Sequence, residues 1–235
     1  MTFLQADCVP LGHAFDEVKP RLVNTAPSLP PILRLQDIGF AYPDQPALAA
    51  GWNASIGPGV TLLYGDTGAG KSALLQVIAG VLPATGKLTL AGVSFDTAPE
   101  AYRRNVFFVD PATDRFDQLT ARECTASLTK DDKGFDKDRW QALVEGFALV
   151  PHIDKKMFML STGSKRKVWM AAGLASGRAL VLLDEPTAGL DGPSTRCLWA
   201  TLSGVAAQSA RAVIAASSTP VDAVPLAQTI ELPLR

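Results

Sequence analysis

Residues 65–72 combine glycines, a lysine and a serine at a spacing that suits phosphate binding. They read GDTGAGKS, which matches the pattern GxxxxGK[ST] in full. The glycines let backbone N–H groups turn toward a phosphate, and a helix starting at Lys71 would add its positive N-terminal end. Lys71 can reach the β- and γ-phosphates of a nucleoside triphosphate, and the Ser72 hydroxyl can bind Mg²⁺. The predicted site consists of Gly65, Asp66, Thr67, Gly68, Ala69, Gly70, Lys71 and Ser72.

Two adjacent carboxylates form a second group that could take part in catalysis. Asp184 and Glu185 directly follow the apolar run 180–183, which predicts a buried strand. In an open α/β sheet, ligands bind at the carboxyl ends of the strands. Asp184 could hold Mg²⁺ there, directly or through water. Glu185 points elsewhere, because strand side chains alternate, and could polarise an attacking water. The two groups together predict a hydrolytic site in which Lys71 and Glu185 are catalytic.

The phosphate-binding segment needs a strand before it and a helix after it, and the sequence provides both. "VTLLYG" is a short apolar run, and "SALLQVIAGVL" has a helical apolar period that ends near Gly80 and Pro83. Strands alternating with helices around a glycine loop favour an α/β sheet. The other predicted strands are "ILRLQDIGFAY", "PALAAGWNASIGPG", "GKLTLAG", "RNVFFVD", "ALVLLDEP", "RAVIAASS" and "QTIELPL".

The rest of the chain divides into a leader and a helical insert. Residues 1–31 contain five prolines and no sustained period, which predicts a leader outside the domain at 32–235. A helical subdomain is expected at about 115–175. Within it, a helical spacing places four apolar side chains on one stripe. They are Trp140, Leu143, Val144 and Phe147.

Composition narrows the class of protein. The net charge is -1, which argues against a nucleic-acid binder that works by neutralising phosphates. The three cysteines show no metal-binding spacing, which favours free thiols in a reducing cytosol. No apolar run approaches the roughly 18–20 residues that span a bilayer, and no signal peptide is evident. We therefore expect a soluble chain that would reach a membrane only through a partner.

These motifs resemble those of the ATP-binding cassette (ABC) ATPases, from about Ile32 to Leu234. "GDTGAGKS" resembles the Walker A motif, and "LVLLDEP" resembles Walker B with the catalytic glutamate. "TAGLD", which ends at Asp191, resembles the D-loop, and "LSTGSKRKV" resembles the ABC signature that precedes Walker B. Tyr42 falls where an aromatic residue of the family stacks on adenine, or it is a turn residue before Pro43.

The resemblance implies a fold, cofactors and partners. The fold would be an α/β P-loop NTPase with a RecA-like core, an antiparallel β subdomain and a small α-helical subdomain. Two cassettes, identical or different, would enclose MgATP, with Ser161, Thr162 and Gly163 contacting the nucleotide of the opposite cassette. A separate transmembrane permease would bind the cassettes at the cytoplasmic face of the inner membrane. The function would then be ATP hydrolysis that drives transport.

The signature and its flank depart from the family pattern. Thr162 replaces a glycine of LSGGQ, and Ser164 replaces the longer amide. The serine and the second glycine remain, so that contact with a phosphate is still expected. The basic run 165–167 that follows is predicted to be the solvated face of the signature helix.

Two other family positions are substituted. His13 and His152 are the only histidines and both precede Walker B, so that the usual histidine after it is absent and Ser218 takes its place. Val109 or Asp110 stands where the Q-loop glutamine is expected, and Asp110 could either bind Mg²⁺ or cap a turn. We therefore expect slow turnover. The alternatives are a weakly hydrolytic cassette that pairs with another subunit and a soluble ABC ATPase without a transport role.

Overall fold

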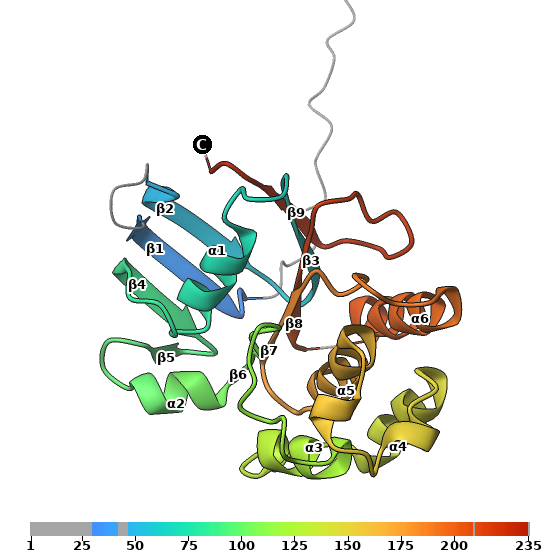
Figure 1. Ribbon diagram of the computed structural model, residues 1–235. Helices are drawn as coiled ribbons and strands as arrows, with labels where there is room; N and C mark the ends of the chain where they lie inside the picture. The colour runs from blue at the N-terminus through green and yellow to red at the C-terminus, as the bar shows by residue number, and fades with distance from the viewer. Residues whose placement is uncertain (1–29, 42–46, 209, 235) are drawn as a thin grey trace, which may run out of the picture.

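A computed structural model describes residues 30–41, 47–208 and 210–234. Tyr42, the predicted adenine contact, lies outside these residues, as does nearly all of the predicted leader. The described part contains two sheets and a group of helices, arranged as Figure 1 shows. No helix within it is long and apolar enough to cross a membrane.

The larger sheet is parallel and has the strand order β6-β7-β8-β3-β9. Its middle strands are mostly apolar and buried, as expected for strands covered on both faces. β8 pairs with both β3 and β7, so that the carboxyl ends of β3 and β7 lie at the same edge, one strand apart. The strands are β3 (Gly59–Tyr64), β6 (Val106–Phe107), β7 (Leu180–Asp184), β8 (Ala212–Ser217) and β9 (Gln228–Glu231).

The smaller sheet is antiparallel and has the order β2-β1-β4-β5. β1 buries Leu33 and Leu35 and exposes the residue between them, which is the alternation of a strand with one covered face, and an irregularity after Leu35 shifts the next buried position to Ile38. These side chains share a core with the buried residues of α1 (Lys71–Ile78), which packs between the two sheets. The elements on this side are β1 (Leu33–Phe40), β2 (Ala49–Ile56), β4 (Thr85–Leu90), β5 (Val93–Ser94) and α2 (Pro99–Arg104).

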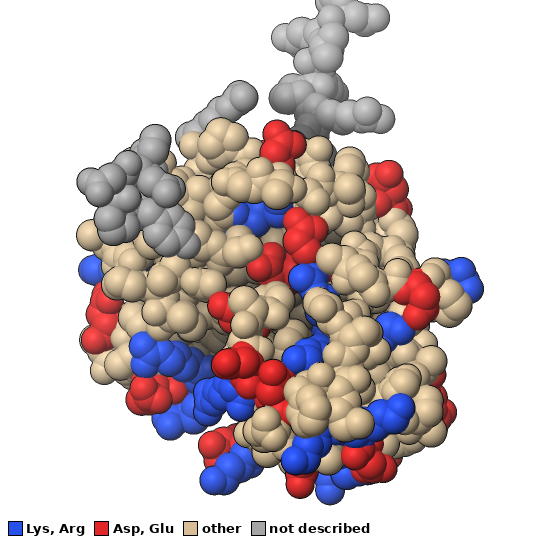
Figure 2. Space-filling view, viewed as in Figure 1, with Lys and Arg blue, Asp and Glu red and all other residues tan. Residues whose placement is uncertain are grey.

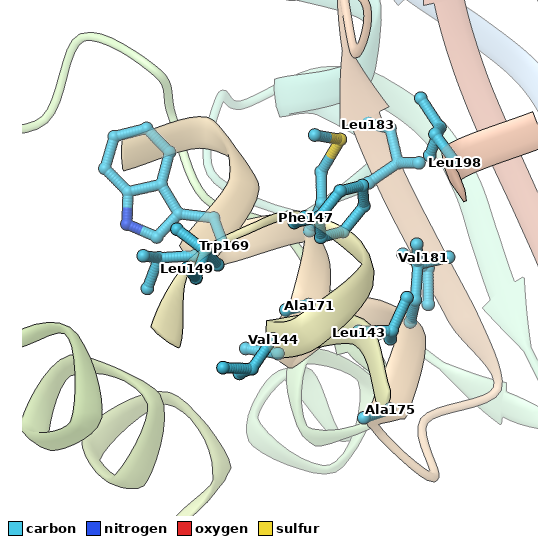
Figure 3. Packing of buried hydrophobic residues seen from close by; sticks show 14 of the residues in the cluster. Leu143, Val144, Phe147, Leu149, Trp169, Ala171, Ala175, Val181, Leu183 and Leu198 are labelled. Atoms are coloured by element: carbon cyan, nitrogen blue, oxygen red, sulfur yellow. The ribbon is translucent and has the colours of Figure 1, made fainter. Parts of the chain in front are cut away.

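The remaining helices gather on the side of the parallel sheet away from the antiparallel one (Figure 1). The predicted apolar stripe lies on α4 and its C-cap: Leu143, Val144 and the C-cap Phe147 are buried, and Trp140 is half-buried. Figure 3 shows the α4 residues meeting side chains of α5 and β7 in one core, together with Leu198 of α6. The helices are α3 (Ala121–Thr129), α4 (Lys137–Gly146), α5 (Thr162–Ala175) and α6 (Gly192–Gln208), with single 3₁₀ turns at Val150–His152 and Met157–Met159.

The structure confirms the α/β fold and the predicted strands and adds elements that the patterns did not indicate. β6 is only two residues long, although a longer strand was predicted around it. α6 was not predicted, and neither was α2. α3, α4 and α5 occupy the predicted helical region, while its bounds at about 115 and 175 stay a prediction.

Candidate nucleotide-binding site

The phosphate loop joins β3 to α1 and is shaped to receive an anion. Gly68 and Gly70 have φ values of 85° and 93°, a left-handed conformation that glycine adopts without a steric penalty. Gly70 is the N-cap of α1 and supplies no side-chain cap, so that the first N–H groups of the helix stay available. The loop therefore keeps the features that its sequence predicted.

Lys71 is the first residue of α1, and its charge is directed inward. Its side chain is 6% exposed, and Nζ donates to the carbonyl oxygens of Gly65 at 2.8 Å and Asp66 at 3.0 Å. The same Nζ lies 3.2 Å from Glu185 Oε1. A buried ammonium needs such partners, because an unpaired charge is costly away from water. Lys71 thus connects the phosphate loop directly to the end of β7.

The two predicted carboxylates meet the phosphate loop because of the sheet order. β7 ends at Asp184, and the Ser72 side chain lies close enough to the Asp184 carboxylate to lower its pKa. The structure therefore brings together four residues from two distant segments, namely Lys71, Ser72, Asp184 and Glu185. Figure 2 shows acidic and basic side chains mixed along the middle of this face, between the α1 side and the α5–α6 side.

Asp184 has the environment of a metal ligand. Burial raises the pKa of its carboxyl group, with the Glu185 charge acting in the same direction, while the Ser72 side chain and the charges of Arg166 and Lys71 lower it. Its Oδ1 is buried and has no hydrogen-bond partner in the described part of the chain. A carboxylate and a hydroxyl are hard oxygen donors, so that Ser72 and Asp184 fit Mg²⁺.

The described residues contain no group of three or more His, Cys, Asp or Glu side chains that could enclose a metal alone. Mg²⁺ does not need such a cage, because it commonly binds through one or two protein ligands, water and substrate phosphates. The donor set therefore fits a metal that binds together with a nucleotide.

Glu185 sits in a backbone conformation that non-glycine residues rarely adopt, with φ of 44°. Its N–H donates to the Ala216 carbonyl at 3.0 Å, which ties it to β8. Ser218, just beyond β8, places Oγ 3.5 Å from Glu185 Oε2. The serine predicted to stand in for a histidine therefore lies beside the carboxylate that it would affect.

Asp110 holds its own loop. Its Oδ1 accepts from the Ala112 N–H at 2.9 Å, and its Oδ2 accepts from Gln76 Nε2 at 3.3 Å. Of the two roles that the sequence left open, turn capping is the one with hydrogen bonds in the structure. Binding of Mg²⁺ by Asp110 stays a prediction.

The signature segment forms the N-terminus of α5. Ser161 is the N-cap: its Oγ accepts from the Ser164 N–H at 3.2 Å and donates to Ser164 Oγ at 3.1 Å. Ser161 and Thr162 are exposed, whereas Gly163 is buried. A Cβ at Gly163 would overlap the Gly189 carbonyl oxygen of the D-loop. In the described part of the chain, both hydrogen bonds of the Ser161 side chain are made to Ser164, within the same helix end.

The prediction of a solvated face for the basic run 165–167 was wrong. Lys165 Nζ lies 2.5 Å from Asp117 Oδ1, and Lys167 Nζ lies 2.6 Å from Asp191 Oδ2. Arg166 Nη1 donates to the backbone carbonyls of Walker B. The signal that could have corrected the prediction is the apolar run after residue 167, because a helix that is apolar nearly all round is buried.

A family model described as ABC transporter matches residues 52–188, more than half of the chain. The match includes the phosphate loop, the signature and both carboxylates. The chain belongs to the ABC transporter family. It is an ABC ATP-binding domain, which confirms the predicted family, P-loop fold and ATP as the nucleotide.

Relatives and solved structures agree with this membership. The phosphonates import ATP-binding protein PhnC 1 of Rhodopseudomonas palustris is 29% identical over 200 residues, covering 78% of this chain and 74% of that protein. The cytochrome c biogenesis ATP-binding export protein CcmA of Rhodospirillum rubrum is 34% identical over 167 residues, covering 70% and 71%. A solved ATP-binding subunit of an ABC transporter has a TM-score of 0.69 at 23% identity over 79% of each chain, which supports the ABC fold.

Proposed function

We propose that this ABC domain binds MgATP, forms a dimer around it with a second cassette, and hydrolyses it to drive a separate membrane permease. The observation that carries the proposal is the ion pair between Lys71 and Glu185, with Ser72 and Asp184 beside it. A phosphate-binding cation, a metal-ligand pair and a base therefore surround one point at the edge of the sheet.

Each residue has a distinct role in hydrolysis. Lys71 exchanges its contacts with the loop carbonyls and Glu185 for the β- and γ-phosphates, which frees the Glu185 carboxylate. Ser72 and Asp184 hold Mg²⁺, which neutralises phosphate charge when bound. Glu185 then orients and polarises the water that attacks the γ-phosphate.

The partners follow from the position of the signature. Its exposed tip, at Ser161 and Thr162, suits a nucleotide presented by another cassette, identical or different. The permease is a separate polypeptide, and the complex works at the cytoplasmic face of the inner membrane. Because one relative is named for import and another for export, the direction of transport is not assigned.

The central test replaces Glu185 with glutamine. Glu185→Gln keeps the size and polarity of the side chain but removes the base, so that ATP turnover should fall about 100-fold or more. Equilibrium binding of a fluorescent ATP analogue should be preserved, because Lys71 and the loop remain. Glu100→Gln, which alters an exposed glutamate on α2, is the matched control and should leave turnover unchanged. Turnover of Glu185→Gln at the parent rate would exclude Glu185 as the base.

A second candidate, a weakly hydrolytic cassette that pairs with a different ABC subunit, is favoured by Ser218. A serine hydroxyl at 3.5 Å from Glu185 can hydrogen-bond but cannot carry the charge of a histidine. ATP turnover should be measured for the purified chain alone and then with a membrane protein encoded by a neighbouring reading frame. Turnover at background in both settings favours this candidate, whereas stimulation by the membrane protein favours the active ATPase.

A further inference from the structure

Arg166 makes an unusual connection between the signature helix and the catalytic carboxylates of the same chain. Its Nη1 donates to the Glu185 carbonyl oxygen at 2.5 Å and to the Asp184 carbonyl oxygen at 3.3 Å. It lies one turn and a residue beyond Ser161, on the same helix. One guanidinium therefore contacts the backbone of both residues that end β7.

The Glu185 backbone needs support, because a left-handed conformation is disfavoured for a residue with a Cβ. Two hydrogen bonds supply part of it: the Glu185 N–H donates to Ala216, and the Glu185 carbonyl accepts from the Ala188 N–H at 3.0 Å. Arg166 adds a charged donor to the same carbonyl, and charged donors form the stronger hydrogen bonds. The direction of the Glu185 side chain therefore depends on where Arg166 holds its backbone.

The neighbouring basic residues do not share this contact. Lys165 pairs with Asp117, and Lys167 pairs with Asp191 of the D-loop. A cavity of about 30 Å³ is lined in part by Arg166 and Asp184. Arg166 is thus separable from its neighbours by substitution.

We propose that Arg166 is a positioning residue that holds Glu185 in its catalytic orientation. Because Arg166 lies on α5, it also couples that orientation to the position of α5. The inference rests on the proposed function, in which Glu185 is the base and the tip of α5 contacts the opposite nucleotide. A displacement of α5 on nucleotide contact would then move the backbone of Glu185 in the same chain.

The test compares Arg166→Met with Lys165→Met. Arg166→Met removes the donor to Glu185 and should lower kcat for ATP about 10- to 100-fold, which is the scale of misplacing a catalytic group. Binding of a fluorescent ATP analogue, measured in the Glu185→Gln background where ATP is not consumed, should change less than about threefold. Lys165→Met removes an equal charge from the same helix and should keep the parent kcat. Arg166→Lys, which retains a charged donor, should fall between Arg166→Met and the parent.

Adding Arg166→Met to Glu185→Gln should cause no further loss of turnover, because the residue acts through Glu185. The positioning role is overturned if Arg166→Met keeps the parent kcat, if it weakens nucleotide binding as much as turnover, or if Lys165→Met has the same effect. It is also overturned if turnover of the double variant falls by the product of the two single-variant factors. Absence of turnover in the parent would contradict the proposed function itself, which separates that failure from failure of the inference.

Discussion

Helices α1 and α5 both begin with small residues that leave backbone N–H groups at the helix N-terminus. The two N-termini are capped differently. At α1, Gly70 supplies no side chain and the N–H groups stay open. At α5, the Ser161 hydroxyl already accepts from Ser164. Lys71 at the start of α1 is buried against Glu185, whereas Ser161 is exposed.

This difference matches the proposed function, in which one chain supplies only half of each nucleotide site. The phosphate loop is assembled by its own parallel sheet, which brings β3 and β7 to one edge. The α5 end is capped by its own residues, so that an arriving phosphate must replace the Ser161 contact with Ser164. Under the proposed function, the first end binds the nucleotide of its own chain and the second contacts the nucleotide of the opposite cassette.

The largest predicted effect comes from mixing two variants, one altered at the N-terminus of α1 and the other at the N-terminus of α5. Lys71→Met should lower ATP turnover about 1,000-fold, and Ser161→Ala about 100-fold, because each removes a donor to the charge that develops on phosphate. If two copies form the sites, an equimolar mixture of the two variants should recover about a quarter of the parent activity, because each hybrid dimer contains one intact site. Steady-state ATP turnover of the mixture measures this recovery.

Thr120→Ala is the control for the loss of a helix cap. Thr120 caps α3 as Ser161 caps α5, with Glu123 completing a capping box. Thr120→Ala should lower stability by about 1 kcal/mol without a specific loss of turnover. If the two variants form mixed dimers but the mixture stays as inactive as each variant alone, the nucleotide sites are not shared between two copies.

The next largest effect concerns the packing of the N-terminus of α5 against the D-loop. Gly163→Ala places a methyl group against the D-loop carbonyl of Gly189, and such overpacking costs about 1–3 kcal/mol. We expect a lower melting temperature and lower ATP turnover, with binding at the phosphate loop retained. Gly204→Ala on α6 is the matched control, since a Cβ there meets nothing within 4 Å, and should gain about 0.5–1 kcal/mol. Equal melting temperatures for the two variants would show that the D-loop yields freely.

The phosphate loop and the carboxylates could be predicted because their chemistry depends on residue type and local spacing. Lys71 and Ser72 are adjacent, and the apolar run before Asp184 marks a strand that ends at the functional edge. The sheet rule that ligands bind at the carboxyl ends of strands then brought the two segments together. The ion pair between Lys71 and Glu185 agrees with that prediction.

The contacts of the basic run could not be predicted, because its partners are far away in sequence. Lys165 meets Asp117 across 48 positions, and Lys167 meets Asp191 across 24. No local period encodes such pairs, which exist only because α5 packs against the end of β7 and the D-loop. α6 was missed for a different reason: its apolar period is weak, although Asp191 and the proline after Gly192 are ordinary signals of a helix start.

The smallest predicted effect concerns the pairing of Lys167 with Asp191. The hydrogen bond from Lys167, together with that from the Ser194 N–H, lowers the pKa of the Asp191 carboxyl group. Folding therefore favours its charged form, and the stability that it contributes is complete above the ordinary carboxyl range. It is lost as the pH falls from there toward the lowered pKa.

Asp191→Asn keeps an oxygen that can accept from the Ser194 N–H but removes the charge opposite the buried Lys167. At pH 7 the variant should melt a few degrees below the parent, because a buried ammonium is left without its counter-ion. The difference should shrink below about pH 4, where the Asp191 carboxylate of the parent begins to be protonated. Melting temperatures of both proteins between pH 7 and pH 3 measure this, with Asp96→Asn, in the exposed loop after β5, as the control. A difference that stays constant over the whole range would mean that shape, not charge, holds the D-loop to α5.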